Sequence, residues 1–288
     1  MTMKNVNDSP NREQAAYWNE QGGPRWVARQ RELDAELEPF GVATMSRLEL
    51  RPGERVLDIG CGSGATSLML AERVRPGAVV GLDISETMLA RARERGKAVD
   101  NLHFECADAQ TFAFSEAAYD AVFSRFGLTF FSDPVAAFVN LRRALRPGGK
   151  LGFVCWRAAR ENPSFTVPLQ AALPFLPEPP KPPDPNAPGP FAFADQHTIA
   201  GILARAGYGD IAITPHDGQL IYGGGPDIEG AVDLALQIGP LGRALSAPSE
   251  MTLAKVRAAV RDAFVPYHGP SGVAFPAAMW LVTARRQS

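Results

Sequence analysis

The chain has 288 residues, 45% of them hydrophobic, enough to bury a sizeable core as one large domain or two small ones. Its net charge of −2 and its scattered lysines and arginines argue against a nucleic-acid-binding face. No long apolar run is present and residues 1–13 are polar, so we expect neither a membrane span nor a signal peptide. The three cysteines lack metal-binding spacing and suggest reduced thiols, so we expect a cytoplasmic protein without a metal site.

The N-terminal segment combines a polar start with helices that carry aromatic residues. Residues 1–10 have the composition of a disordered end. Helical spacing follows over residues 12–37, with an expected break at Gly22-Gly23-Pro24. The apolar side of this helix carries Tyr17, Trp18 and Trp26. A second helix is expected to begin at Pro39 and to cover residues 39–48.

A glycine-rich turn between a strand and a helix is the most informative pattern in the chain. The apolar run Val56, Leu57 and Ile59 is typical of a buried strand, and glycines follow at positions 60, 62 and 64 before a helix over residues 65–74. A second strand over residues 78–83 ends in an acid. Glycines let the backbone approach a ligand, and an acid at this position can accept hydrogen bonds from ribose hydroxyls. The pattern therefore predicts a site for a nucleoside-containing cofactor.

Strands and helices continue to alternate after this unit. We expect helices over residues 86–95 and 134–145, and strands over residues 102–106, 121–124 and 150–156. A third acid, Asp108, follows the first of these strands. Such alternation requires crossover connections, so it predicts an α/β fold with a mostly parallel sheet and helices on both faces.

A proline-rich segment over residues 162–190 separates this part from the C-terminal elements. It could be a flexible linker, but its apolar flanks favour a partly ordered lid. Beyond it we expect a helix over residues 195–206, a strand over 211–222, helices over 228–238 and 252–264 joined by a turn at 239–242, and a closing strand over 273–284.

Four motifs follow one another between residues 58 and 154. They are Asp58-Ile-Gly-Cys-Gly-Ser-Gly64, Leu82-Asp-Ile-Ser-Glu-Thr-Met-Leu89, Tyr119-Asp-Ala-Val-Phe-Ser124 and Leu145-Arg-Pro-Gly-Gly-Lys-Leu-Gly-Phe-Val154. In this order they resemble the class I S-adenosylmethionine-dependent methyltransferases, and the string as far as Trp156 is similar to a bacterial group related to quinone-ring methylases. The resemblance implies a Rossmann-like seven-stranded, mostly parallel sheet with an antiparallel last strand. It also implies S-adenosyl-L-methionine as the cofactor.

The resemblance carries over to individual cofactor contacts. Gly60, Cys61 and Gly62 would line the methionyl and ribose portions. Asp58 would face the amino group, directly or through water, and Asp83 would hold both ribose hydroxyls. The other implied contacts are Ile84 and Met88 on adenine, Asp108 and the Ala109 N–H on its polar edge, the Ser124 carbonyl near the methionyl amine, and Tyr17, Trp18 and Trp26 over the cofactor. Core packing is the alternative for Met88 and the aromatic residues, and a helix cap is the alternative for Asp108.

The acceptor side is less defined. Arg125 and Phe126 stand where some families carry an Asn/Asp-Pro-Pro-Tyr motif, which is absent here. The expected lids contribute Phe, Leu, Ile and Pro and few charges, so they favour methyl transfer to a small, largely apolar or aromatic acceptor through oxygen, nitrogen or carbon. No catalytic residue is identified, because none of the four histidines is favoured over a structural role. A non-catalytic S-adenosylmethionine-binding or regulatory protein, or an NAD-dependent oxidoreductase, are the other hypotheses, and the glycine spacing disfavours the second.

We expect one methyltransferase domain over residues 1–288. Its core is expected at residues 38–156, 191–223 and 268–288, with cap segments at residues 12–37, 157–190 and 224–267. The last cap segment would insert about 45 residues between the final two strands, too many for a hairpin turn. Long insertions on a rigid scaffold commonly determine substrate specificity. The sequence does not indicate the oligomeric state.

Overall fold

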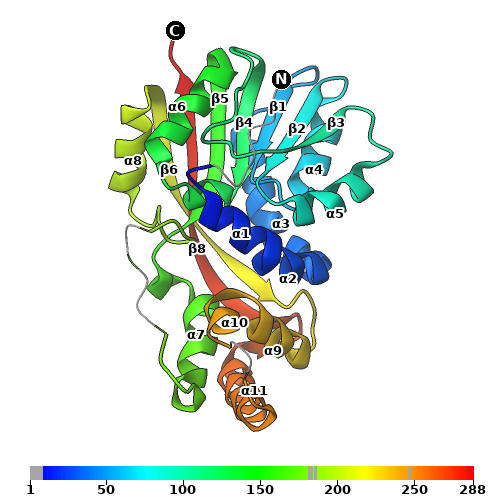
Figure 1. The fold of residues 1–288 in the computed structure, drawn as a ribbon, viewed down its shortest axis with the longest axis vertical. Helices are drawn as coiled ribbons and strands as arrows, with labels where there is room; N and C mark the ends of the chain where they lie inside the picture. Colours follow the sequence, from blue (N-terminus) through cyan, green and yellow to red (C-terminus); the bar gives the residue numbers. More distant parts are fainter. Residues whose placement is uncertain (1–8, 181–183, 185–186, 246–247) are drawn as a thin grey trace.

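A central β-sheet organises the chain (Figure 1). The computed structural model describes residues 9–180, 184, 187–245 and 248–288, and within them the strand order is β3-β2-β1-β4-β5-β8-β6, with β7 paired beside β8. The strands are β1 (Arg55–Ile59), β2 (Ala78–Asp83), β3 (Leu102–Cys106), β4 (Tyr119–Arg125), β5 (Leu145–Trp156), β6 (Tyr208–Tyr222), β7 (His268–Gly269) and β8 (Gly272–Arg286). Strands β1 to β5 are parallel and β8 is antiparallel to β5 and β6. The predicted Rossmann-like sheet with an antiparallel last strand is confirmed.

Helices cover both faces of the sheet. They are α1 (Arg12–Glu20), α2 (Gly22–Ala28), α3 (Gln30–Arg47), α4 (Ala65–Val74), α5 (Glu86–Gly96), α6 (Pro134–Ala144), α7 (Pro163–Ala172), α8 (Gln196–Arg205), α9 (Ile228–Gln237), α10 (Gly239–Ala244) and α11 (Glu250–Phe264). Short 3-10 turns lie at Gly127–Phe130, Ala159–Glu161, Leu173–Phe175 and Val265–Tyr267. No helix among the described residues has the length and apolar character needed to cross a membrane.

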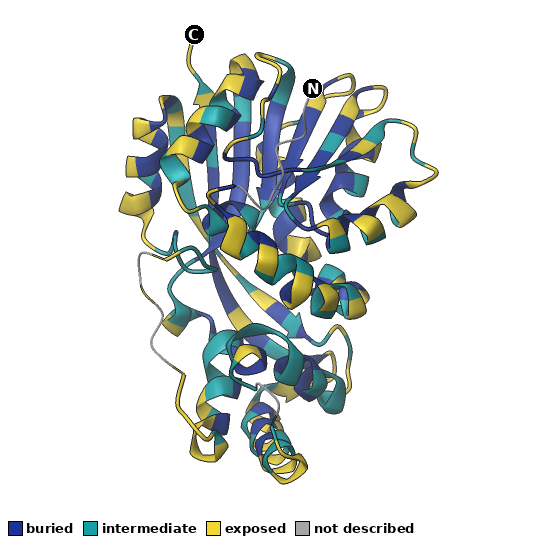
Figure 2. Cartoon of the chain, in the orientation of Figure 1, coloured by how far each residue is buried: buried dark blue, intermediate teal, exposed yellow. Residues whose placement is uncertain are grey.

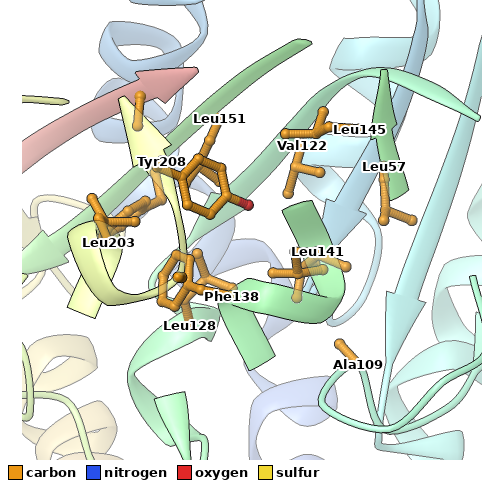
Figure 3. Packing of buried hydrophobic residues seen from close by; sticks show 14 of the residues in the cluster. Leu57, Ala109, Val122, Leu128, Phe138, Leu141, Leu145, Leu151, Leu203 and Tyr208 are labelled. Carbon is orange, nitrogen blue, oxygen red and sulfur yellow. The ribbon is translucent and has the colours of Figure 1, made fainter. Parts of the chain in front are cut away.

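Successive strand residues point to opposite faces, so each central strand contributes to two layers of the core. Val56, Ala121 and Phe123 pack with residues of α3 and α4 on one face. Leu57 and Val122 pack with α6 and α8 on the other face, in the cluster that Figure 3 shows around Phe138 and Tyr208. Figure 2 shows the strands mostly buried and the outer faces of these helices exposed. The core therefore holds the carboxyl ends of the parallel strands in a rigid frame.

Strands β6 and β8 are the longest elements of the sheet and extend beyond it. Their antiparallel ladder runs from Tyr208 opposite Arg286 to Tyr222 opposite Val273. In Figure 1, α7, α9, α10 and α11 gather around the far end of this ladder, away from the C-terminus. These helices share one apolar cluster with α3 and the ends of β5, β6 and β8. The chain between β6 and β8 thus joins α7 in a helical group at the end of a two-stranded arm.

Three local expectations differ from the structure. The N-terminal helix is interrupted as expected, but at Gln21, and Gly22-Gly23-Pro24 begins the next helix, α2. A Cβ on Gly23 would lie 1.9 Å from the Trp18 carbonyl oxygen, so glycine permits the close approach of α1. Pro39 lies inside α3, where the burial of Phe40 and its neighbours compensates for the one backbone hydrogen bond that proline lacks. The expected turn at residues 239–242 is part of helix α10, with its proline in the first turn.

Parts of two other expectations lie outside the described residues. Most of the polar start, residues 1–8, belongs to this group. Residues 181–183 and 185–186 of the proline-rich segment do as well. Before them, helix α7 and a 3-10 turn occupy Pro163–Ala172 and Leu173–Phe175, so the apolar flank of that segment is ordered.

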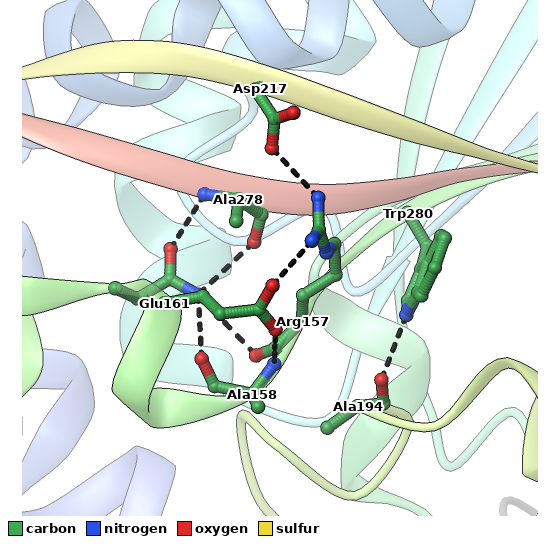
Figure 4. Close-up of polar contacts among 8 residues, drawn as sticks. Arg157, Ala158, Glu161, Ala194, Asp217, Ala278 and Trp280 are labelled. Atoms are coloured by element: carbon green, nitrogen blue, oxygen red, sulfur yellow. Dashed lines mark hydrogen bonds and ion pairs between the residues drawn. The ribbon is translucent and has the colours of Figure 1, made fainter.

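Asn162 joins the end of β5 to the arm. Its side chain is fully buried. Its amide nitrogen donates to the carbonyls of Ala278 (3.1 Å) and Ala158 (3.2 Å), and its oxygen accepts from the Ala278 N–H at 2.9 Å. Beside it, Arg157 lies between Asp217 and Glu161 (Figure 4). This polar cluster fixes where α7 leaves the sheet.

We expect Asn162→Ala to lower the free energy of unfolding by about 2–3 kcal/mol, because it leaves the buried Ala278 N–H without a partner. Urea denaturation measures this loss. The control Asp217→Ala removes an ion pair whose carboxylate side chain is 78% exposed, and it should cost less than about 1 kcal/mol. Equal losses in the two variants would contradict the assignment of Asn162 as the structural junction.

Candidate functional site

A cavity of about 260 Å³ lies at the carboxyl ends of β1, β2, β4 and β5, the edge where open α/β sheets bind ligands. Its lining includes these predicted residues: Tyr17, Trp18, Trp26, Gly60, Cys61, Gly62, Asp83, Ile84, Met88, Asp108, Ala109, Arg125 and Phe126. Asp58 and Ser124 were also predicted as contacts, but they are fully buried behind this lining. The structure therefore brings residues far apart in sequence to one cavity, with two of them in its supporting layer.

The glycine loop approaches its neighbours too closely for side chains. Gly60, Gly62 and Gly64 all have positive φ, at 66°, 55° and 83°. A Cβ on Gly60 would lie 2.8 Å from the Gly127 Cα, and one on Gly62 would lie 2.8 Å from the Met88 Cε. The loop thus presents bare backbone to the cavity, as close binding of a ligand requires.

Asp83 stands at the end of β2 facing this loop. Its carboxylate accepts one hydrogen bond from the Gly62 N–H (2.8 Å) and one from the Ser85 N–H (2.9 Å). Burial raises the pKa of Asp83, and the hydrogen bonds from Ser85 and Gly62 act in the opposite direction. Each oxygen keeps a lone pair, so the group can still accept two hydroxyl donors.

Two buried atoms of opposite charge near the loop have no partner among the described residues. Asp58 Oδ2 accepts from the hydroxyls of Thr66 (2.7 Å) and Ser67 (2.6 Å), but Oδ1 accepts nothing. Arg125 Nη1 is likewise unpaired, while its Nη2 lies 3.7 Å from Asp34. Burial raises the pKa of Asp58 to about 6, and the charge of Arg125 acts to lower it. Buried unsatisfied polar atoms cost free energy, and a zwitterionic amino-acid group could satisfy both.

Asn11 is a neighbour of Asp108 that the sequence did not indicate. Its amide nitrogen donates to both carboxylate oxygens, at 2.9 and 3.0 Å, and its oxygen accepts from the Ser132 N–H at 2.7 Å. Asp108 also accepts from the Gln110 N–H at 2.9 Å. Asn11 therefore fixes the N-terminal segment to Asp108. The contact of Asp108 with adenine stays a prediction.

The aromatic residues of α1 and α2 form a wall of the cavity. Trp18 makes edge-to-face contacts with Tyr17, Trp26 and Phe130, with ring centroids 5.2, 5.8 and 5.5 Å apart. The Ser85 hydroxyl donates to the Trp18 carbonyl at 2.7 Å, which ties α1 to the loop before α5. These side chains therefore line the cavity, and their contact with the cofactor stays a prediction.

One part of the cavity, here called the aromatic half, has a lining that includes Phe126, Trp156, Phe165, Leu220, Tyr222 and Ile238. Phe126 stacks on Trp156 with ring centroids 4.5 Å apart and an interplanar angle of 11°. Phe165 of α7 meets Trp156 edge-on at 5.2 Å. Phe126 has a φ of 64°, a left-handed conformation that is costly for a bulky residue and commonly found at functional sites.

Glu36 is the charged residue of the aromatic half that the sequence analysis missed. It lies on α3, lines the cavity, and is only 7% exposed. Its Oε2 accepts from the Gly223 N–H at 3.4 Å, and burial raises the pKa of the Glu36 carboxyl to about 8. Leu33, Leu37 and Phe40 form an apolar stripe at helical spacing, and position 36 falls within it. An acid inside an apolar stripe is the signal that could have identified this residue.

Comparisons with known proteins agree with the motifs. Residues 56–149 match a family described as a methyltransferase domain. The demethylmenaquinone methyltransferase of Corynebacterium kroppenstedtii is 33% identical over 178 residues, covering 59% of this chain and 74% of that protein. The malonyl-acyl-carrier-protein O-methyltransferase of a Marinomonas species is 36% identical over 109 residues, but this chain spans only 40% of that protein.

A solved structure has a similar fold at low sequence identity. Phosphoethanolamine N-methyltransferase 2 of Haemonchus contortus, in complex with phosphomonomethylethanolamine and S-adenosylhomocysteine, has a TM-score of 0.54 and 19% identity, covering 87% of this chain and 53% of that chain. This likeness concerns the fold alone. With the motif order, the sheet topology and the relatives in hand, the chain belongs to the class I S-adenosylmethionine-dependent methyltransferases, and S-adenosylmethionine is its cofactor.

The site fits this cofactor. The bare glycine loop can receive the methionyl and ribose portions, and the free lone pairs of Asp83 suit ribose hydroxyls. The orphaned atoms of Asp58 and Arg125 complement the ammonium and carboxylate of the methionyl group. Residue by residue, these contacts remain predictions.

Asp83→Ala should weaken binding of S-adenosylmethionine roughly 10- to 150-fold, because hydrogen bonds to a carboxylate contribute about 1.5–3 kcal/mol. Isothermal titration calorimetry measures the change, with urea denaturation to verify that the variant folds. The control is Asp100→Ala, which removes an acid that is 79% exposed and paired with Arg75, and its affinity should equal that of the parent. If Asp83→Ala binds within about threefold of the parent, Asp83 is not the ribose acid.

The raised pKa of Glu36 predicts how the free energy of unfolding depends on pH. Between pH 4.5 and about 8, the folded protein keeps a proton on Glu36 that the unfolded chain has lost, so stability falls as pH rises through this window. The contribution is at most ~1.4 kcal/mol per pH unit. Glu36→Gln should remove this slope from urea denaturation curves, and the exposed control Glu38→Gln should keep it. Identical slopes in parent and Glu36→Gln would show that the Glu36 pKa is not raised.

Proposed function

We propose that the protein transfers a methyl group from S-adenosylmethionine to a small, largely apolar or aromatic acceptor. The observation that carries the proposal is the composition of the cavity. The glycine loop and Asp83 line one end, and the aromatic half, with Phe126, Trp156 and Phe165, continues from it. A donor and a flat acceptor can therefore lie in contact inside one cavity.

Bound S-adenosylmethionine supplies a methyl group activated by a sulfonium centre. The task of the protein is then to hold an acceptor atom close to that methyl group and in line with the bond that breaks. Phe126 and Trp156 stack on each other without space for a third ring between them, so an aromatic acceptor would pack against the outside of this pair, beside Phe165. Three aromatic residues of α1 and α2, Tyr17, Trp18 and Trp26, restrict the access of water to the cavity. Orientation and exclusion of water require no metal ligand from the chain.

The charges around the cavity favour an acceptor without phosphate groups. Arg243 lines the cavity, but its guanidinium lies 4.7 Å from the centre of the Tyr17 ring and donates to the Tyr17 hydroxyl at 3.1 Å. Arg125 lies beside Asp34 and Asp58. Arg243 is thus held against Tyr17, and the unpaired Nη1 of Arg125 is assigned to the methionyl carboxylate, so apolar burial rather than ion pairing is the main source of acceptor affinity in this proposal.

Two relatives act on different acceptor classes by their names. Demethylmenaquinone is a quinone-ring acceptor and matches the aromatic half, whereas the malonyl-acyl-carrier-protein enzyme acts on a carrier-bound acid. The stacked Phe126 and Trp156 favour the ring class for this chain. We further propose one domain, with the core at residues 38–156, 191–223 and 268–288 and caps at residues 12–37, 157–190 and 224–267, acting in the cytoplasm without nucleic acid as partner.

Phe165→Ala should raise the KM for an aromatic acceptor about 10-fold or more, because burial of one aromatic side chain is worth about 1.5–3 kcal/mol. Affinity for S-adenosylhomocysteine should not change. A panel of phenolic, quinoid and alkaloid-like acceptors, scored by product formation, measures this. The control is Phe175→Ala, in the 3-10 turn Leu173–Phe175 that follows α7. Phe175 is 38% exposed and does not line the cavity, so this variant should have the KM of the parent.

Methyl transfer should also change little between low and physiological salt, since no phosphate backbone is bound. Transfer only to tRNA or a basic protein, with a steep loss of activity on adding salt, would overturn the small-molecule assignment.

A further inference from the structure

Glu36 of α3 places a carboxyl group in the lining of the aromatic half. Leu33 and Leu37 line the cavity from the same helix, and Leu220 and Tyr222 line it from β6. An acid so placed lowers stability whenever it is charged, because apolar surroundings solvate the charge poorly. Perturbed acids in a cavity of this kind are candidates for acid–base chemistry.

The carboxyl group has spare hydrogen-bonding capacity. Among the described residues, the Gly223 N–H is the donor that reaches it, at a long 3.4 Å. Gly223 and Gly224 have positive φ, at 81° and 68°, and a Cβ on Gly223 would lie 2.7 Å from the Ala231 Cα. This glycine turn brings an amide to Glu36 while leaving most of its lone pairs free for a ligand.

Among the described residues, no cation forms an ion pair with Glu36, and its pKa responds only to burial and to the Gly223 N–H. The arginine on the same helix, Arg29, pairs with Glu32 at 3.4 Å and donates to Gln237 of α9 at 3.1 Å. Arg243 of α10 contacts Tyr17, and Arg125 of β4 lies 3.7 Å from Asp34.

Tyr222 of β6 is a second titratable group that lines the cavity. Burial and the charge of Glu36 raise the pKa of the Tyr222 hydroxyl, so it stays protonated and cannot act as a base. The pKa of Glu36, about 8, lies near the working pH, where a general base is most effective.

We propose that Glu36 is the general base of the methyl transfer and that the acceptor accordingly presents a weakly acidic ring hydroxyl to it. This inference rests on the proposed function. The hydroxyl proton passes to a Glu36 oxygen, the hydroxyl oxygen forms a bond to the methyl carbon, and the methyl–sulfur bond breaks with its electron pair left on sulfur. Glu36 releases its proton to water when the products leave. Phe126 and Trp156 hold the ring during this exchange.

The activity test compares Glu36→Gln with Glu36→Asp and with Glu38→Gln, an exposed acid two residues away on α3. With a phenol that is protonated at the assay pH, Glu36→Gln should lower kcat about 10²- to 10³-fold. Glu36→Asp should recover a large part of the loss, and Glu38→Gln should match the parent. With a nitro-substituted phenol already ionised at the assay pH, Glu36→Gln should lose less than about threefold, since no base is needed. Equal losses on both phenols would overturn the proposal.

A binding test keeps the proposal falsifiable without turnover. In the complex with S-adenosylhomocysteine, the absorbance of bound 4-nitrophenol reports its ionisation. Above about pH 8, Glu36 and the phenolate would both be ionised and would repel each other, so the affinity of the parent for nitrophenolate should fall about tenfold per pH unit, whereas the affinity of Glu36→Gln should stay constant. The same pH dependence in both proteins means that Glu36 does not face the hydroxyl.

The two proposals fail in different ways. If no small molecule in the acceptor panel is methylated and nitrophenol does not bind, the small-molecule function fails and the role of Glu36 falls with it. If a small molecule is methylated equally by the parent and Glu36→Gln, the proposed function stands and only the role of Glu36 is overturned.

Discussion

The pairing of β8 with both β5 and β6 is the constraint on which the cavity depends. Through β5, the last strand is fixed to the parallel sheet that ends in the glycine loop and Asp83. Through β6, it continues to Tyr222, where the Gly223 turn meets Glu36. One continuous ladder therefore sets the distance between the part of the cavity that fits S-adenosylmethionine and the aromatic half. Asn162 secures the same strand at Ala278, where α7 departs.

Burial of charge is the common feature of the site. The pKa values of Asp58, Asp83 and Glu36 are all raised by burial. Each group is charged only at a cost that a suitable ligand can offset, by donating hydrogen bonds or supplying opposite charge. The apo protein therefore has acids whose hydrogen-bonding capacity is incompletely used, and the ligands that fit are those that complete it. This links the stability of the fold to the chemistry of the site.

The sequence predicted the parallel half of the fold well, because local patterns determine it. Strands β2 and β3 have the bounds expected from their apolar runs, and the glycine loop lies where its motif indicated. The prediction from sequence failed where tertiary contacts override the low helix propensity of proline and glycine. The buried face around Phe40 keeps Pro39 inside a helix, and close helix packing places Gly23 within α2.

The site could be predicted only in part for the same reason. Motif order indicated Asp83 and the loop, but it did not indicate that Asp58 lies behind the residues that line the cavity, with one carboxylate oxygen left without a partner among the described residues. Asn11 lies 97 positions from Asp108, and Glu36 is 187 positions from Gly223, so their contacts arise from the topology and not from any local pattern. Position 36 within an apolar stripe was the one available signal.

The most direct measurement is a crystal structure of the protein soaked with S-adenosylhomocysteine and a phenolic acceptor. The expected electron density has the ribose on Asp83, the methionyl group between Asp58 and Arg125, and the acceptor ring beside Phe126 with its hydroxyl facing Glu36. Density for the nucleoside away from Asp83, or for the phenol outside the aromatic half, would contradict a cavity that holds donor and acceptor in contact.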